Sequence, residues 1–115
     1  MLRFVFLFFL MSSVAQGKPF FCRKADVDSA SKRAMARTGN DKNMHCSVSC
    51  LLTLRCHSTQ VRTLGYLKEL KDVFGPGDAD ALDIVADELG ISLVLVGRAK
   101  SDRECFSECD LYYPR

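Results

Sequence analysis

Apolar residues recur every three to four positions over most of this chain, a spacing that predicts amphipathic helices. The first predicted helix covers about 27–37 and stops at Gly39. The second covers about 42–56 and begins behind Asn40 or Asp41, either of which can cap its first turn. Because the second helix combines leucine, valine and cysteine residues, we expect it to lie at the centre of the fold.

The third and fourth predicted helices each have an apolar side that suits a core. The third covers about 59–74, and Gly75-Pro76-Gly77 ends it because proline cannot continue the hydrogen-bond ladder. The fourth covers about 79–89, begins behind Asp78 and stops at Gly90. The residues expected to face inward are Tyr66, Leu67, Leu70, Val73 and Phe74 on the third helix, and Leu82, Val85, Ala86 and Leu89 on the fourth.

The residues after the fourth helix are ambiguous. Residues 91–96 read Ile-Ser-Leu-Val-Leu-Val, and their branched side chains favour a short strand or an extended segment that covers the core. Residues 101–110 can form a short helix that carries Cys105 and Cys109. We therefore predict an all-α, disulfide-stapled bundle of about four helices, with either a short strand or extended chain near 91–96.

The N-terminus has the pattern of a secretory signal peptide. Arg3 precedes an apolar run over 4–11, and Ala15-Gln16-Gly17 supplies small residues where signal peptidase cleaves. The run is shorter than the roughly 18 residues that a membrane-spanning helix needs, and we expect no transmembrane segment after cleavage. The predicted organisation is a signal peptide at 1–17 and a single helical domain at 18–115, in a secreted or periplasmic protein.

The charge of the chain is close to balanced. The 115 residues include 16 Lys and Arg and 14 Asp and Glu, a formal net charge of +2. Nucleic-acid binders present strongly basic faces, and polybasic membrane tethers cluster about four to eight basic residues. Neither pattern occurs in this sequence, so we expect no nucleic-acid partner.

Six cysteines follow the predicted cleavage site, and an even number in a small exported chain indicates a disulfide framework. Cys46 and Cys50 are four residues apart, as are Cys105 and Cys109, and residues four apart share one face of a helix. Two such pairs on antiparallel helices can be bridged twice. The predicted bridges are Cys46–Cys109, Cys50–Cys105 and Cys22–Cys56.

The rival use of these thiols is a zinc site. Four cysteines together with His45 or His57 have suitable chemistry. However, the closely spaced cysteines are predicted on helices rather than in loops, and an oxidising compartment consumes free thiols. We therefore predict neither a metal nor a cofactor.

Candidate chemistry is limited to one histidine and several carboxylates. His45 lies near the start of the second predicted helix. Glu69 and Asp72 are three apart on the third, and Asp83 and Asp87 are four apart on the fourth. Three interpretations stay open: solvated carboxylates that pair with neighbouring basic side chains, a structural polar network around the histidine, or a catalytic or cation-binding site. The candidate catalytic residues are His45, Glu69, Asp72 and Asp83.

The segment 39–91 resembles two known families through short motifs. The run from Asp41 to His45, the Gly75-Pro76-Gly77 break and the acidic run that ends at Gly90 are similar to serum amyloid A proteins. This resemblance implies a secreted four-helix bundle that associates and binds lipids or other apolar ligands, although those proteins lack this cysteine framework. The His-Cys-x-x-x-Cys run and the later Lys-Glu-x-x-Asp resemble cysteine-bearing domains at the ends of bacterial Rhs-type proteins, which implies a toxin-like activity centred on His45, Glu69, Asp72 and Asp83.

Two functions follow from these observations. The favoured one is an exported, non-enzymatic binding or structural module whose partner is a protein, a lipid or an envelope component. The apolar run 91–96, Phe20 and Phe21 can contribute to binding if they are exposed. The alternative is a toxin-like small hydrolase or effector that uses His45 as a base with nearby carboxylates. The sequence has no standard nucleophile or phosphate-binding motif, so it leaves open whether the protein is an enzyme.

Overall fold

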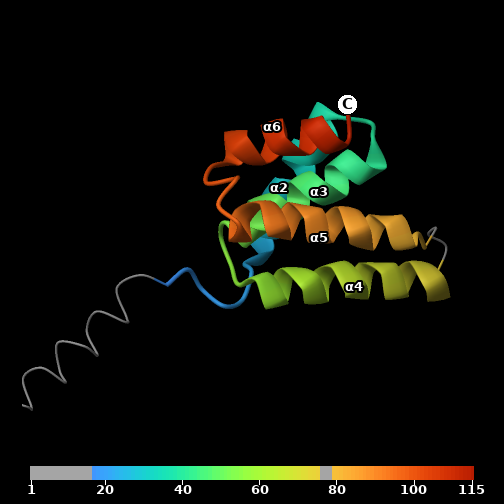
Figure 1. The fold of residues 1–115 in the computed structure, drawn as a ribbon. Helices are drawn as coiled ribbons and strands as arrows, with labels where there is room; N and C mark the ends of the chain where they lie inside the picture. Colours follow the sequence, from blue (N-terminus) through green and yellow to red (C-terminus); the bar gives the residue numbers. More distant parts are fainter. Residues whose placement is uncertain (1–16, 76–78) are drawn as a thin grey trace, which may run out of the picture.

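The computed structural model describes residues 17–75 and 79–115, which form five helices and no strand (Figure 1). All of the predicted signal peptide except Gly17 lies outside these residues, as does the predicted cap Asp78. Among the described helices, none combines the length and the apolar character that a bilayer span requires. The predicted all-α fold is confirmed, with the helices α2 (Lys24–Arg37), α3 (Asp41–Thr53), α4 (Ser58–Phe74), α5 (Ala81–Leu95) and α6 (Asp102–Tyr112).

Helix α3 is the central helix, as predicted. It contacts each of the other four helices, and nine of its thirteen residues are buried. The Asn40 side chain caps α3 by accepting hydrogen bonds from the backbone N–H groups of Lys42 and Asn43, at 3.0 and 3.3 Å. In Figure 1, α6 lies on one side of α3 and the α4–α5 hairpin lies on the other.

The three disulfides have the predicted pairing. Two of them join α3 to α6 across consecutive turns, and the third joins the segment before α2 to the turn after α3. No cysteine of the described residues is free, so these thiols cannot bind zinc. Each bridge is expected to contribute roughly 2–4 kcal/mol, mainly by restricting the unfolded chain. The pairs are Cys46–Cys109, Cys50–Cys105 and Cys22–Cys56.

The strand or extended segment predicted near 91–96 is wrong, because α5 continues through Gly90 to Leu95. Gly90 does not end the helix. It lies where α5 crosses α3, and a Cβ atom there would overlap the backbone carbonyl oxygen of Cys46. The close approach buries Ile91 completely, and this packing outweighs the roughly 1 kcal/mol that glycine costs inside a helix.

The apolar side of α4 points in the opposite direction from the one predicted. Five large apolar side chains expected in the core are 50% to 86% exposed: Tyr66, Leu67, Leu70, Val73 and Phe74. On α5, Leu82 and Val85 are exposed as well, at 61% and 55%, whereas Ala86 is buried as predicted. The inner side of the α4–α5 hairpin instead buries three carboxylates, which belong to Glu69, Asp83 and Asp87.

These carboxylates point inward because the facing helix, α3, supplies basic partners for them. Lys42 and His45 of α3 lie opposite α5 and form ion pairs with Asp83 and Asp87. Buried carboxylates are tolerated when they are paired and hydrogen-bonded. The basic side chains of α3 therefore determine which side of α5 is buried.

Candidate functional site

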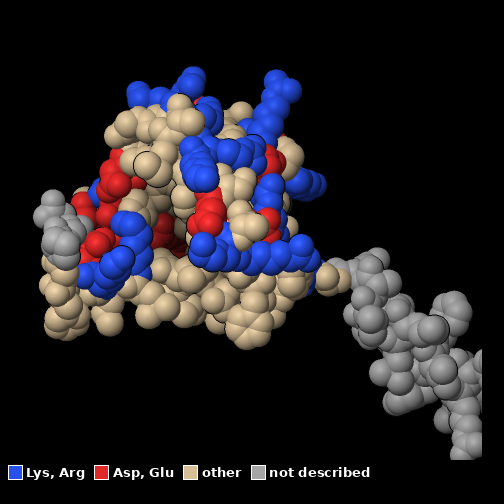
Figure 2. Space-filling model, turned by 180° about the vertical axis from the view of Figure 1, so that it is seen from behind, with Lys and Arg blue, Asp and Glu red and all other residues tan. Residues whose placement is uncertain are grey.

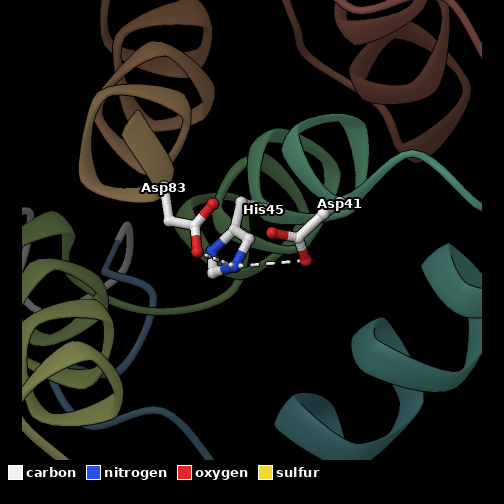
Figure 3. A group of neighbouring side chains, drawn as sticks. All are labelled: Asp41, His45 and Asp83. Atoms are coloured by element: carbon white, nitrogen blue, oxygen red, sulfur yellow. Dashed lines mark ion pairs between the residues drawn. The ribbon is translucent and has the colours of Figure 1, made fainter. Parts of the chain in front are cut away.

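His45 lies between two carboxylates that α5 supplies, and it is only 9% exposed. Its Nδ1 is 2.9 Å from Asp87 Oδ1, which also accepts a hydrogen bond from Ser49 Oγ at 3.0 Å. Its Nε2 is 3.3 Å from Asp83 Oδ2 and 3.8 Å from Asp41 Oδ1 (Figure 3). Both nitrogens of the imidazole therefore have a carboxylate neighbour.

These neighbours favour the protonated form of His45. Burial lowers the pKa of His45, but the hydrogen bond to Asp87 and the negative charges of Asp87 and Asp83 outweigh burial, so the pKa is raised above its ordinary value of 6.5. A histidine that is held as an imidazolium has no free nitrogen with which to accept a proton. The protonated form favours a structural polar network over general-base catalysis.

Lys42 fixes the outer end of this network. Its Nζ is 2.6 Å from Asp80 Oδ2 and also contacts Asp83 Oδ1. The hydrogen bonds to Asp80 and Asp83 raise the pKa of Lys42. Burial raises the pKa of Asp83, but the hydrogen bond from Lys42 and the charge of His45 outweigh it, so the pKa of Asp83 is lowered. Lys42 and Asp83 are therefore both charged at neutral pH.

Three of the four predicted site residues lie around one lysine of α4. The Nζ atom of Lys68 is 3.4 Å from His45 Nε2, 3.4 Å from Asp72 Oδ2 and 3.9 Å from Glu69 Oε1. The fourth residue, Asp83, joins this group through its contact with His45. The structure therefore brings His45, Glu69, Asp72 and Asp83 into one network of charged side chains.

Glu69 is the most deeply placed of the α4 carboxylates. It is 6% exposed, and its Oε2 accepts a hydrogen bond from the backbone N–H of Asp80 at 3.1 Å. Its Oε1 has no hydrogen-bond partner among the described residues. The Lys68 ammonium lies 3.9 Å from this oxygen, too far for a hydrogen bond but close enough for an ion pair.

Three members of the site were not among the predicted residues. They are Asp41, Lys68 and Asp87, of which Asp87 was predicted beside Asp83 but not as a catalytic candidate. Each has a helical-spacing signal: Asp41 is four residues before His45, Lys68 is four before Asp72, and Asp87 is four after Asp83. Gly65 on α4 makes room for one of them, because a Cβ atom there would lie 2.7 Å from Asp87 Oδ2. The spacing alone does not reveal this contact between helices.

A pocket of about 410 Å³ opens beside His45, between α2, α3 and α4. This volume lies in the range of small-molecule sites, roughly 300–1,000 Å³. Figure 2 shows this face of the molecule as hollowed, with both acidic and basic side chains around the recess. Eight of its fourteen lining residues are apolar or glycine, namely Val27, Met35, Met44, Val48, Leu52, Val61, Leu64 and Gly65, and the polar end holds Asp41, His45, Lys68 and Asp87.

Comparison with protein-family models, curated proteins and solved structures gave no match. The resemblances to serum amyloid A and to Rhs-type domains are therefore not supported by any of these comparisons. The function has to be argued from the fold and from this site.

The stability of the protein is expected to fall as the pH rises through the folded-state pKa of His45. Because that pKa is raised, the imidazolium stabilises the folded state fully below the unfolded value of about 6.5, and the contribution is lost above the folded value. Thermal unfolding between about pH 6 and pH 9, in the presence of EDTA, measures this loss. His45→Gln removes the titrating group, and an equal fall in that variant would contradict the assignment.

Proposed function

We propose that this protein is an exported, non-enzymatic module that binds lipid surfaces through the outer side of the α4–α5 hairpin. The observation that carries the proposal is the exposed apolar side of this hairpin. Large exposed apolar patches on soluble domains mark interaction sites. Seven large apolar side chains there are 50% to 86% exposed: Tyr66, Leu67, Leu70, Val73, Phe74, Leu82 and Val85.

Two features favour a lipid over a second protein as the partner. In Figure 2, uncharged side chains form the lower edge of the molecule, where α4 runs in Figure 1, and Lys and Arg side chains border this edge from above. A basic border is suited to anionic lipid headgroups. In addition, α4 lines the pocket with Val61, Leu64 and Gly65, so that an acyl chain could enter from the lipid surface into an apolar cavity.

Export is part of the same proposal. It is supported by the predicted signal peptide and by three disulfides in a chain of 115 residues, since disulfides persist in oxidising compartments. Of the other apolar residues expected to contribute, Phe20 and Phe21 are exposed, at 48% and 70%. In the run 91–96, Leu95 and Val96 are exposed as well, whereas Ile91 and Leu93 belong to the core.

Leu70→Glu is expected to weaken binding to anionic vesicles by about tenfold or more. Leu70 is 58% exposed, so the change leaves the core intact, but it removes an apolar side chain worth roughly 1.5–3 kcal/mol when buried and adds a charge at the interface. Co-sedimentation with phosphatidylcholine–phosphatidylglycerol vesicles measures the bound fraction. Leu111→Glu is the matched control, because Leu111 is 75% exposed on α6 and should leave binding unchanged.

Other outcomes of this experiment identify other partners. Failure of the wild-type protein to bind vesicles, together with concentration-dependent dimerisation that Leu70→Glu abolishes, would assign the apolar side to a second copy of the chain. The hydrolase alternative rests on the position of His45 and Asp87 in the pocket wall. Release of fatty acid from the same vesicles by wild-type protein, but not by His45→Gln, would establish that alternative and contradict a non-enzymatic role.

A further inference from the structure

We infer that Asp41, His45 and Asp83 form a binding site for a divalent metal ion of the zinc class, at the polar end of the pocket. Each residue offers one ligand atom, and these three atoms all lie within 4.8 Å of one another. Figure 3 shows the imidazole of His45 between the two carboxylates, one from the first turn of α3 and one from α5. This site is independent of lipid binding by the α4–α5 hairpin.

The distances from His45 Nε2 to the two carboxylates are close to those between ligand atoms of a zinc site. Zinc bonds of about 2.0–2.2 Å to nitrogen and oxygen in tetrahedral geometry place ligand atoms about 3.3–3.5 Å apart. His45 Nε2 is already 3.3 Å from Asp83 Oδ2. It is 3.8 Å from Asp41 Oδ1, and the Asp41 side chain is 58% exposed, so it can move the remaining few tenths of an ångström.

His45 is oriented as a metal-ligating histidine is. Such a histidine usually donates its other ring N–H to a carboxylate, which fixes the ring and directs the free nitrogen at the metal. Here Nδ1 is 2.9 Å from Asp87 Oδ1, and the hydroxyl of Ser49 fixes the same carboxylate oxygen. Asp87 therefore directs Nε2 toward Asp41 and Asp83.

The charge of the cluster also points to a missing cation. Glu69 Oε1 is buried without a hydrogen-bond partner among the described residues, and the Lys68 ammonium, which pairs with it at 3.9 Å, also pairs with Asp72. Six carboxylates surround three basic groups in this network: Asp41, Glu69, Asp72, Asp80, Asp83 and Asp87 against Lys42, His45 and Lys68. An additional divalent ion would reduce this excess of negative charge.

Lys68 is the competitor of the metal in this arrangement. Its ammonium lies 3.4 Å from Nε2, and its side chain is 55% exposed. When the ion binds, Nε2 gives up its proton to solvent and the Lys68 side chain swings out of the cluster. One nitrogen and two carboxylate oxygens suit Zn²⁺, whereas Ca²⁺ takes six to eight oxygen ligands.

Calorimetric titration of EDTA-treated, full-length protein with Zn²⁺ alone, near neutral pH, tests the inference. We expect one ion per chain, and Asp41→Asn is expected to weaken binding at least about tenfold, the loss that even an outer partner of a metal ligand brings. Lys68→Met is expected to tighten binding because it removes the competing ammonium. Lys71→Met, a change at an exposed lysine on the same helix, is the control and should leave the affinity unchanged.

Asp41→Asn is chosen because Asp41 is exposed and its replacement should leave the fold intact, which circular dichroism checks. An absence of Zn²⁺ binding by the wild-type protein would overturn the inference. Binding that neither Asp41→Asn nor Lys68→Met changes would overturn it as well, because the ion would then lie elsewhere. Vesicle binding measured in EDTA reports separately on the proposed lipid-binding function.

Discussion

Gly90→Ala is expected to destabilise the protein by about 3 kcal/mol, the upper end of the range for overpacked interiors. The added Cβ would overlap the carbonyl oxygen of Cys46 and lie 3.0 Å from the backbone nitrogen of Cys50. Both atoms belong to the backbone of α3, which cannot rotate away as a flexible side chain would. Cys46 and Cys50 are also bonded to α6, so α3 cannot easily shift to make room.

The expected loss of stability is opposite in sign to the usual effect of replacing glycine by alanine inside a helix. Alanine in a helix interior normally stabilises it by roughly 0.5–1 kcal/mol relative to glycine, so a loss of stability can come only from the contact with α3. Urea unfolding gives the free energies of unfolding for wild type and variant. Gly39→Ala, where a Cβ meets nothing within 4 Å, is the matched control and should change little. A stabilised Gly90→Ala would show that α3 and α5 do not approach this closely.

The disulfide framework and the central helix could be predicted because they depend on local spacing. Cys46 and Cys50 project from one face of a helix whatever surrounds it, and the same holds for Cys105 and Cys109. If these two faces oppose each other on antiparallel helices, Cys46 pairs with Cys109 and Cys50 pairs with Cys105. Cys22 and Cys56 are then left to pair with each other, and the structure has these three disulfides. Local helix spacing was thus sufficient here.

The directions of α4 and α5 could not be predicted from periodicity. A helix with an apolar side and a carboxylate side normally buries the apolar one. Here α3 presents Lys42 and His45 toward α5, and these partners draw Asp83 and Asp87 inward. The outcome depends on contacts between helices that are distant in sequence, which a helical period does not encode. The same is true of Gly90, whose neighbour is the backbone of α3.

Several residues of the candidate site could be named from the sequence, but the contacts between them could not. His45 and Asp83 are in direct contact, whereas Glu69 and Asp72 are linked to His45 through Lys68. From the sequence alone, Lys68 is expected to be a surface residue that pairs with a carboxylate four residues away. Its position next to the imidazole follows from the packing of α4 on α3, so its role could be recognised only in the folded structure.

Asp87→Ala is expected to destabilise the protein by about 3 kcal/mol, the lower end of the range for breaking a buried ion pair, because Asp83 still faces the other nitrogen of the imidazole. The Asp87 carboxylate is 7% exposed, and its Oδ1 is the acceptor for both His45 Nδ1 and Ser49 Oγ. Its removal leaves these two buried groups without that acceptor. Urea unfolding near pH 6, where His45 is charged, measures the loss. Asp28→Ala, which breaks the exposed pair of Lys24 and Asp28, should have little effect.

The double variant His45→Leu with Asp87→Ala separates the ion pair from the packing of its two members. If Asp87 acts mainly by neutralising the His45 imidazolium, removing both charges abolishes the uncompensated group, and the double variant loses less stability than the two single variants together. The expected difference is about 1–3 kcal/mol, as for other residues in direct contact. Strictly additive losses would show that Asp87 stabilises the fold through Ser49 and α4 instead, and would also remove the orienting role that the metal site assigns to it.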